Sequence, residues 1–176
     1  MLAVGACFWA ARWNRYVLIG VVLALALNWF GDSLDGTLDR YRNQQRPRYG
    51  FYVDHVIDAV GALSLFGGLA LGGLMSLPIA AAILIAFYLL SIEAYLATYT
   101  LANFRLSHFK FSPTELRILL AIGALVAISR PFVNLNHHQY LLFDVGGVIA
   151  SAGMLFIFIL STVRNTIRLY REEPLP

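Results

Sequence analysis

The sequence predicts an all-α integral membrane protein: a bundle of five full transmembrane helices preceded by a partial one at the N-terminus. Composition is the first observation, because 59% of the 176 residues are hydrophobic and only 13% are charged, roughly half the charged share of a soluble domain. Long uncharged stretches are the second, at residues 16–31, 59–92, 94–104, 118–129 and 145–163. Since a helix needs about 20 mostly apolar residues to cross a bilayer, these stretches form the centres of the expected spans.

The five expected spans cover residues 16–40, 49–74, 78–103, 113–131 and 143–166. The stretch 59–92 is too long for one crossing, and Gly72, Gly73 and Pro78 near its middle predict a tight turn between two helices. The first two spans continue past their apolar centres into charged residues, as helices do where charges face a polar cavity inside a bundle.

Residues 1–11 are apolar but too short to cross a bilayer, and they lack the basic start and the cleavage site of a secretory signal. Two interpretations remain: an interfacial helix, or the last part of a sixth span whose beginning would precede residue 1. No linker or inverted repeat divides the chain, so we expect a single membrane domain over residues 1–176. Cys7 is the only cysteine, which excludes an internal disulfide and a cysteine metal cluster.

The basic residues predict the orientation of the chain. Ten of the 13 lysines and arginines fall at one end of the expected spans: Arg40, Arg42, Arg46, Arg48, Arg105, Lys110, Arg117, Arg164, Arg168 and Arg171. Only Arg12, Arg15 and Arg130 fall at the other end. Because basic loops remain in the cytoplasm, we expect the C-terminus there. The net charge of +3 suits loops that face an anionic leaflet, and it requires no nucleic-acid partner.

A cluster of carboxylates is the main functional signal. Five of the ten acidic residues lie within 27 positions, at Asp32, Asp35, Asp39, Asp54 and Asp58. The first three are spaced i, i+3, i+7 and the last two i, i+4, so each set forms a stripe on one helix face. Two antiparallel helices joined by an arginine-rich loop would bring the two stripes face to face near the cytoplasmic surface.

Two interpretations of this cluster remain. Unpaired carboxylates repel one another and lose hydration, and a divalent cation with oxygen ligands, Mg²⁺ in particular, would compensate for both effects. The alternative is a solvated acidic rim balanced by the arginines of the 40–49 loop. Gly36 interrupts the first helix, either for close approach of a ligand or for packing against another helix.

The residues around the cluster resemble a known signature. Asp32-Ser-Leu-Asp35-Gly36-Thr-Leu-Asp39-Arg40, nine further residues, and Gly50-Phe-Tyr-Val-Asp54-His-Val-Ile-Asp58 match seven of the eight fixed positions of the CDP-alcohol phosphotransferase (CDP-alcohol phosphatidyltransferase) family. That signature is D, two residues, DG, two residues, AR, eight or nine residues, G, three residues, D, three residues, D. Asp39 stands where the family has Ala. The family has about six spans, and most of its first span would precede residue 1.

The resemblance implies transfer of a substituted phosphate group from a CDP-linked donor to an alcohol hydroxyl, with release of CMP, in phospholipid biosynthesis. It implies that Asp32, Asp35 and Asp54 hold one or two Mg²⁺ or Mn²⁺ ions, and that Asp58 is a ligand, a general base, or both. Gly36 would let the nucleotide lie against the helix. Gly50 belongs to the same binding motif, and Arg40 either contacts the donor phosphate or pairs with the carboxylates.

The sequence leaves the donor and the acceptor partly undetermined. One half of the family uses CDP-diacylglycerol and a small alcohol, and the other uses CDP-choline or CDP-ethanolamine with diacylglycerol as acceptor. His55, Tyr99, Arg105 and the pair Thr114-Glu115 resemble the second branch. Family members are often homodimers, and Gly68 with Gly72 has a spacing that permits close helix approach. Packing within one chain is the default interpretation of that pair, and a homodimer surface is the secondary one.

Several polar residues have two interpretations. Glu93, inside an apolar run, either faces a substrate pocket or makes a structural hydrogen bond. Glu115 either lines the acceptor pocket or begins a helix, where an acid complements the dipole. His137 and His138 are adjacent and make a poor pair of zinc ligands. They fall in an expected external loop, opposite the carboxylates.

Two other functions are compatible with the residues. A cation transporter is one, because acids within a membrane commonly mark ion pathways, although these acids gather at one face and not at the midplane. A catalytically silent scaffold descended from the family is the other, on account of Asp39 and the absent part of the first span.

Overall fold

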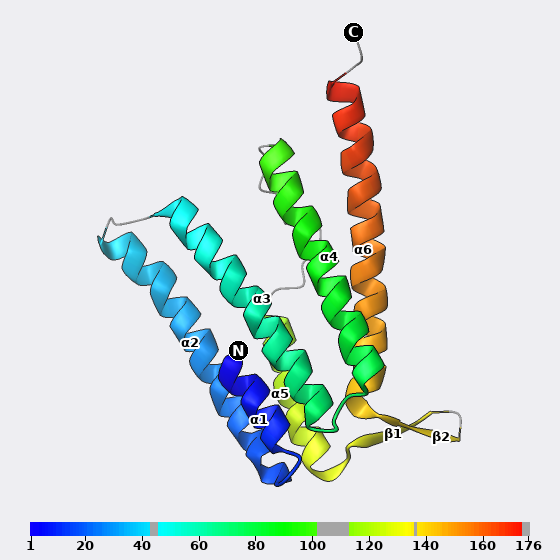
Figure 1. Cartoon of the computed structure of the whole chain (residues 1–176). Helices are drawn as coiled ribbons and strands as arrows, with labels where there is room; N and C mark the ends of the chain where they lie inside the picture. The colour runs from blue at the N-terminus through cyan, green and yellow to red at the C-terminus, as the bar shows by residue number, and fades with distance from the viewer. Residues whose placement is uncertain (43–45, 102–112, 136, 174–176) are drawn as a thin grey trace.

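The computed structural model describes residues 1–42, 46–101, 113–135 and 137–173, with residues 35–42, 47 and 113 described for their backbone only. Helices make up most of this structure, and one small hairpin interrupts them (Figure 1). The elements in chain order are α1 (Leu2–Ala10), a 3₁₀ turn η1 (Arg15–Val17), α2 (Leu18–Arg42), α3 (Pro47–Leu71), α4 (Leu77–Leu101), α5 (Pro113–Ser129), β1 (Phe132–Leu135), β2 (His138–Leu141) and α6 (Leu142–Glu172).

Four of the described helices are long and apolar enough to cross a membrane, within the segments Arg15–Leu34, Arg48–Leu71, Leu77–Leu101 and Leu142–Glu172. These correspond to four of the five expected spans. The fifth, α5, is a helix of 17 residues, which is at the lower end of the length range for a crossing helix. The described helices are therefore consistent with the predicted α-helical membrane protein, whereas the prediction of five full spans is not confirmed.

A tight turn connects α3 to α4, as the glycines predicted. Gly73 has a positive φ of 71°, a conformation that glycine adopts without steric cost. The amides of Leu74 and Met75 both donate to the carbonyl of Leu69, at 3.0 and 3.2 Å. Asp144 Oδ1, in the first turn of α6, accepts a hydrogen bond of 2.7 Å from the amide of Ser76. That bond joins the start of α6 to this turn.

Residues 132–141 depart from the all-α expectation. β1 and β2 pair antiparallel, with Phe132 opposite Leu141 and Leu135 opposite His138. His137, at the turn, has a φ of 68°. The β-branched and aromatic residues of this segment favour strands. Because the two strands are close together in the sequence, they can pair with each other. The expected external loop is thus a hairpin, and it lies at the end of the molecule opposite the start of α3 (Figure 1).

The core lies where α1 packs against α2 and α3. Its largest fully buried side chains are Phe8, Leu18, Leu69, Val4 and Val21. A Cβ added at Gly68 would overlap the backbone of Gly5, and one added at Gly72 would overlap the carbonyl of Phe8. The Gly68–Gly72 pair therefore lets α1 approach α3 within one chain. This pair is not a free surface for a homodimer.

Candidate active site

The predicted acidic residues lie on two helices that are consecutive in the chain, α2 and α3. The last turns of α2 and the first turns of α3 lie at the same end of the molecule, where α4 and α6 also finish (Figure 1). Asp32 is on α2, and Asp54 and Asp58 are on α3. All three side chains are exposed, so they are accessible to a ligand from outside the protein.

Charges from both helices reach Asp58. The carboxylate of Asp58 interacts electrostatically with Asp54 and His55 on its own helix, and with Asp32 and Arg117 on α2 and α5. Asp54 and Asp58 are one helical turn apart and share a face. The structure therefore brings two further predicted metal ligands, Asp32 and Asp54, within electrostatic range of Asp58.

Arg117 is a member of this cluster that the sequence did not identify. Its guanidinium forms an ion pair with Asp32 Oδ2, and its side chain is only 14% exposed against 53% for Asp32. Arg117 Nε is buried and has no hydrogen-bond partner within the described ranges. The sequence placed this arginine only among the basic residues that set orientation. Its pairing with Asp32 could not be predicted, because the two residues are 85 positions apart in the sequence and lie on different helices.

Tyr95 of α4 is a second member that the sequence did not identify. Its ring contacts His55 edge-on, with centroids 4.7 Å apart, and it interacts electrostatically with Asp58. Phe51 stacks on His55 at 4.1 Å, and the Phe51 carbonyl oxygen lies 2.5 Å from His55 Nδ1. Phe51, His55 and Tyr95 thus form one aromatic cluster, and two of its members, His55 and Tyr95, interact electrostatically with Asp58.

The other predicted site residues on α2 lie outside the described side chains. Asp35, Gly36, Asp39 and Arg40 belong to α2 by their backbone. Gly50 is described, and its amide donates to the Arg46 carbonyl at 2.9 Å in the first turn of α3. A Cβ added at Gly50 would meet no atom within 4 Å, so there is open space beside this turn.

The carboxylates fit a hard divalent cation by their chemistry, because Mg²⁺ and Mn²⁺ prefer oxygen ligands. Their arrangement is not a finished metal cage: within the described residues, no three histidines, cysteines, aspartates or glutamates converge on one point. Asp32 is instead turned toward Arg117. The metal assignments therefore stay a proposal that rests on chemistry and on the grouping of the three charges.

The structure also shows where the other polar residues with two interpretations lie. Glu93 Oε1 accepts a hydrogen bond of 2.7 Å from Asn165 Nδ2 of α6, and Glu93 also lines a groove between α4 and α6. Glu115 lies in the first turn of α5, as expected for an acid that begins a helix. His137 and His138 lie in the hairpin. Arg105 falls outside the described residues.

Comparison with known proteins gives one match. The family model described as CDP-alcohol phosphatidyltransferase matches residues 1–163. That range contains the whole aspartate signature and runs to within 13 residues of the end of the 176-residue chain. No curated protein and no solved structure matches the chain.

Proposed function

The chain belongs to the CDP-alcohol phosphatidyltransferase family, and from this membership we propose that it transfers a substituted phosphate group from a CDP-linked donor to an alcohol. The reaction releases CMP and contributes to phospholipid synthesis. One structural observation supports this most: Asp32 and Asp58, from two helices, act on each other electrostatically. Both are fixed positions of the family signature, as is Asp54 between them.

Asp32, Asp35, Asp54 and Asp58 are the residues that would hold divalent metal. When bound, one or two Mg²⁺ or Mn²⁺ ions would neutralise charge on the donor phosphates and on departing CMP. Gly36, Arg40 and Gly50 would bind the nucleotide part of the donor. This role is consistent with the open space beside Gly50.

Asp58 is the proposed general base. The acceptor hydroxyl oxygen forms a bond to the phosphorus that carries the substituent, and the bond from that phosphorus to the bridging oxygen breaks. CMP leaves with the bonding electron pair, and Asp58 takes the hydroxyl proton. His55 and Tyr95 interact electrostatically with Asp58, and they would help to orient its carboxylate toward the acceptor.

Arg117 would bind the donor. Its guanidinium already meets a carboxylate oxygen of Asp32, and its buried Nε is unsatisfied within the described ranges. A guanidinium presents several donors in a planar fork that matches phosphate oxygens. Arg117 is therefore suited to hold a donor phosphate while it balances the negative charge of the acids.

The donor and the acceptor can be identified in one assay. Membranes that contain the full chain are incubated with Mg²⁺ and, separately, with CDP-diacylglycerol, CDP-choline and CDP-ethanolamine, each with a suitable acceptor. Mass spectrometry then identifies the lipid product. We expect one donor class to yield a phospholipid together with CMP. The proposal fails if no donor yields CMP above the level of membranes lacking the protein.

The resemblance of His55 and Tyr99 to the amino-alcohol branch supports CDP-choline or CDP-ethanolamine as donor. Tyr99 is 89% exposed, so its side chain is accessible to a lipid acceptor. If CDP-diacylglycerol alone is used, the branch assignment is wrong and the transfer chemistry stands.

A further inference from the structure

A groove separates the C-terminal halves of α4 and α6. The two helices lie together near the hairpin and diverge toward the C-terminus (Figure 1). The groove has a volume of about 960 Å³, which is in the range of ligand sites. Its walls are mainly apolar and include Leu90, Ala94 and Ala97 of α4 and Phe156, Leu160 and Val163 of α6.

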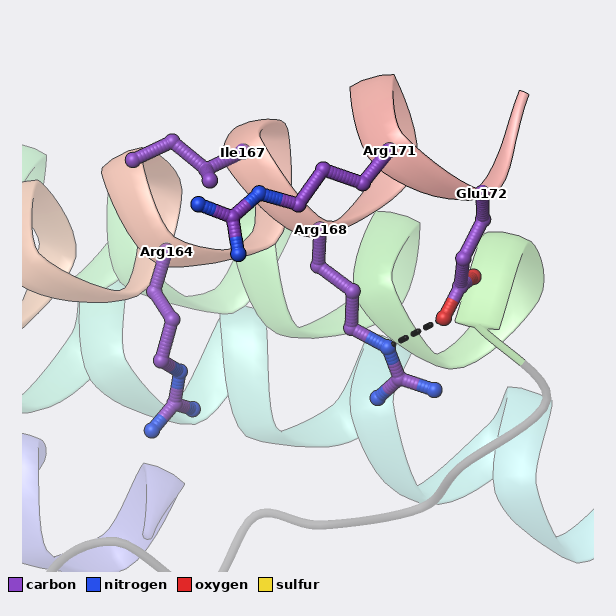
Figure 2. Close-up of a pocket in the computed structure, with 5 residues that line it drawn as sticks. All are labelled: Arg164, Ile167, Arg168, Arg171 and Glu172. Atoms are coloured by element: carbon purple, nitrogen blue, oxygen red, sulfur yellow. Dashed lines mark hydrogen bonds and ion pairs between the residues drawn. The ribbon is translucent and has the colours of Figure 1, made fainter. Parts of the chain in front are cut away.

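Basic side chains mark the outer end of this groove. Arg164 and Arg168 line the groove itself, and they also line a smaller adjoining pocket of about 340 Å³ together with Arg171 and Glu172. Figure 2 shows Arg164 and Arg168 extending to the same side of α6, with Arg168 paired to Glu172. The Arg168 Nε to Glu172 Oε1 distance is 2.7 Å. Three guanidinium groups and one carboxylate thus line the smaller pocket, which leaves a net positive charge around it.

The position of these arginines along α6 matches a membrane surface. Residues 142–163 contain a single charged side chain, Asp144 in the first turn. At about 1.5 Å per residue, these 22 residues span roughly 33 Å, close to the hydrocarbon thickness of about 30 Å. Arg164 and Arg168 therefore lie at the depth of lipid headgroups when α6 crosses the bilayer.

The groove is distinct from the acidic site. Residues two apart on a helix point to opposite sides, and on α4 Tyr95 faces His55 of α3 while Glu93 faces Asn165 of α6. Asn165 Nδ2 also lies 3.4 Å from Ser161 Oγ. Glu93 is the acidic residue of the groove itself, and its bond to Asn165 fixes the contact between the two walls.

We propose that this groove binds a phospholipid with an anionic headgroup. The headgroup phosphate lies on Arg164 and Arg168, and an acyl chain lies along the apolar walls. Basic pockets between helices at a membrane surface recognise anionic headgroups in this way, and guanidinium groups match phosphate oxygens. This site is additional to the proposed transfer reaction and does not depend on it.

The test uses the full chain in phosphatidylcholine nanodiscs that contain a small share of photoactivatable lipid. One preparation holds phosphatidylglycerol with a diazirine in its acyl chain, and the other holds the matching phosphatidylcholine. We expect labelling by the phosphatidylglycerol probe to exceed labelling by the phosphatidylcholine probe by about fivefold or more, given the contribution of each arginine near a surface. The labelled peptides should come from residues 90–101 and 156–168.

The double variant Arg164→Gln/Arg168→Gln should remove this excess and leave phosphatidylcholine labelling unchanged. Arg12→Gln/Arg15→Gln is the matched control, because these exposed arginines lie at the other end of the molecule and their loss changes net charge equally. This control variant should keep the excess of labelling by the phosphatidylglycerol probe. An equal reduction in both double variants would mean attraction by net charge alone and would overturn the proposal.

A second measurement uses the unaltered chain, so the test does not depend on the folding of a variant. Unlabelled phosphatidylglycerol should compete with the phosphatidylglycerol probe at 90–101 and 156–168, whereas unlabelled phosphatidylcholine should not. Equal labelling by the two probes, or equal competition, would show general contact with surrounding lipid only and would overturn the proposal.

Discussion

Asp58 interacts electrostatically with charged groups on three helices. Asp54 lies one turn away, Asp32 and Arg117 act on it from two other helices, and it interacts electrostatically with Tyr95 of α4. The sequence could predict the pairing of Asp54 with Asp58, because a spacing of four residues is local. It could not predict Arg117 or Tyr95, whose positions depend on how α5 and α4 pack.

Replacing the proposed base should abolish most of the catalytic rate without abolishing donor binding. Asp58→Asn keeps the size of the side chain but cannot accept the proton, so we expect kcat to fall by about 10²–10⁴-fold. CMP release from the identified donor measures this. Glu173→Gln, a carboxylate-to-amide change at the end of α6, is the matched control and should have no effect. Unchanged kcat in Asp58→Asn would show that Asp58 is not the base.

Arg117 allows a separate test of donor binding. If its guanidinium holds a donor phosphate, Arg117→Gln should raise the KM for the donor several-fold, and Arg117→Lys should restore part of the loss because the charge remains. Initial rates over a range of donor concentrations give both constants. An unchanged KM with a lower Mg²⁺ requirement would show instead that Arg117 serves only as a counter-ion for Asp32.

At the scale of elements, the apolar stretches predicted four spans closely, because hydrophobicity within one segment decides whether it crosses a membrane. The packing of α1 on α3 was not predicted, since it depends on Gly5, Gly68 and Gly72 meeting across more than 60 residues of sequence. The hairpin at 132–141 was missed because its strands are only four residues each. Short segments of this kind carry little periodic signal.

The close approach of α1 to α3 leads to a stability prediction. In Gly72→Ala the new methyl group would overlap the Phe8 carbonyl, so the helices must separate, at a cost of roughly 1–3 kcal/mol. We expect a lower Tm in detergent. Gly67→Ala is the control on the same helix, because a Cβ there meets nothing within 4 Å and alanine favours helix. Equal Tm values in the two variants would contradict the packing described for α1.

For the whole molecule, the distribution of arginines predicts which end faces the cytoplasm. The test starts from Cys7→Ser, which removes the single cysteine. Glu173→Cys should then be labelled by a membrane-impermeant maleimide only after the membrane is opened. Asn134→Cys, in the hairpin strand β1, should be labelled in intact cells. The reverse pattern would show that the basic end lies outside and would place the acidic site there too.

The central claim is that acids from α2 and α3 form one metal-dependent site for transfer from a CDP-linked donor. Mg²⁺-dependent CMP release by the unaltered chain, Asp54→Asn and Glu173→Gln tests it most directly. We predict release that EDTA abolishes and Mg²⁺ restores, with activity lost in Asp54→Asn and kept in Glu173→Gln. Release that persists in EDTA, or that Asp54→Asn retains in full, would contradict the claim.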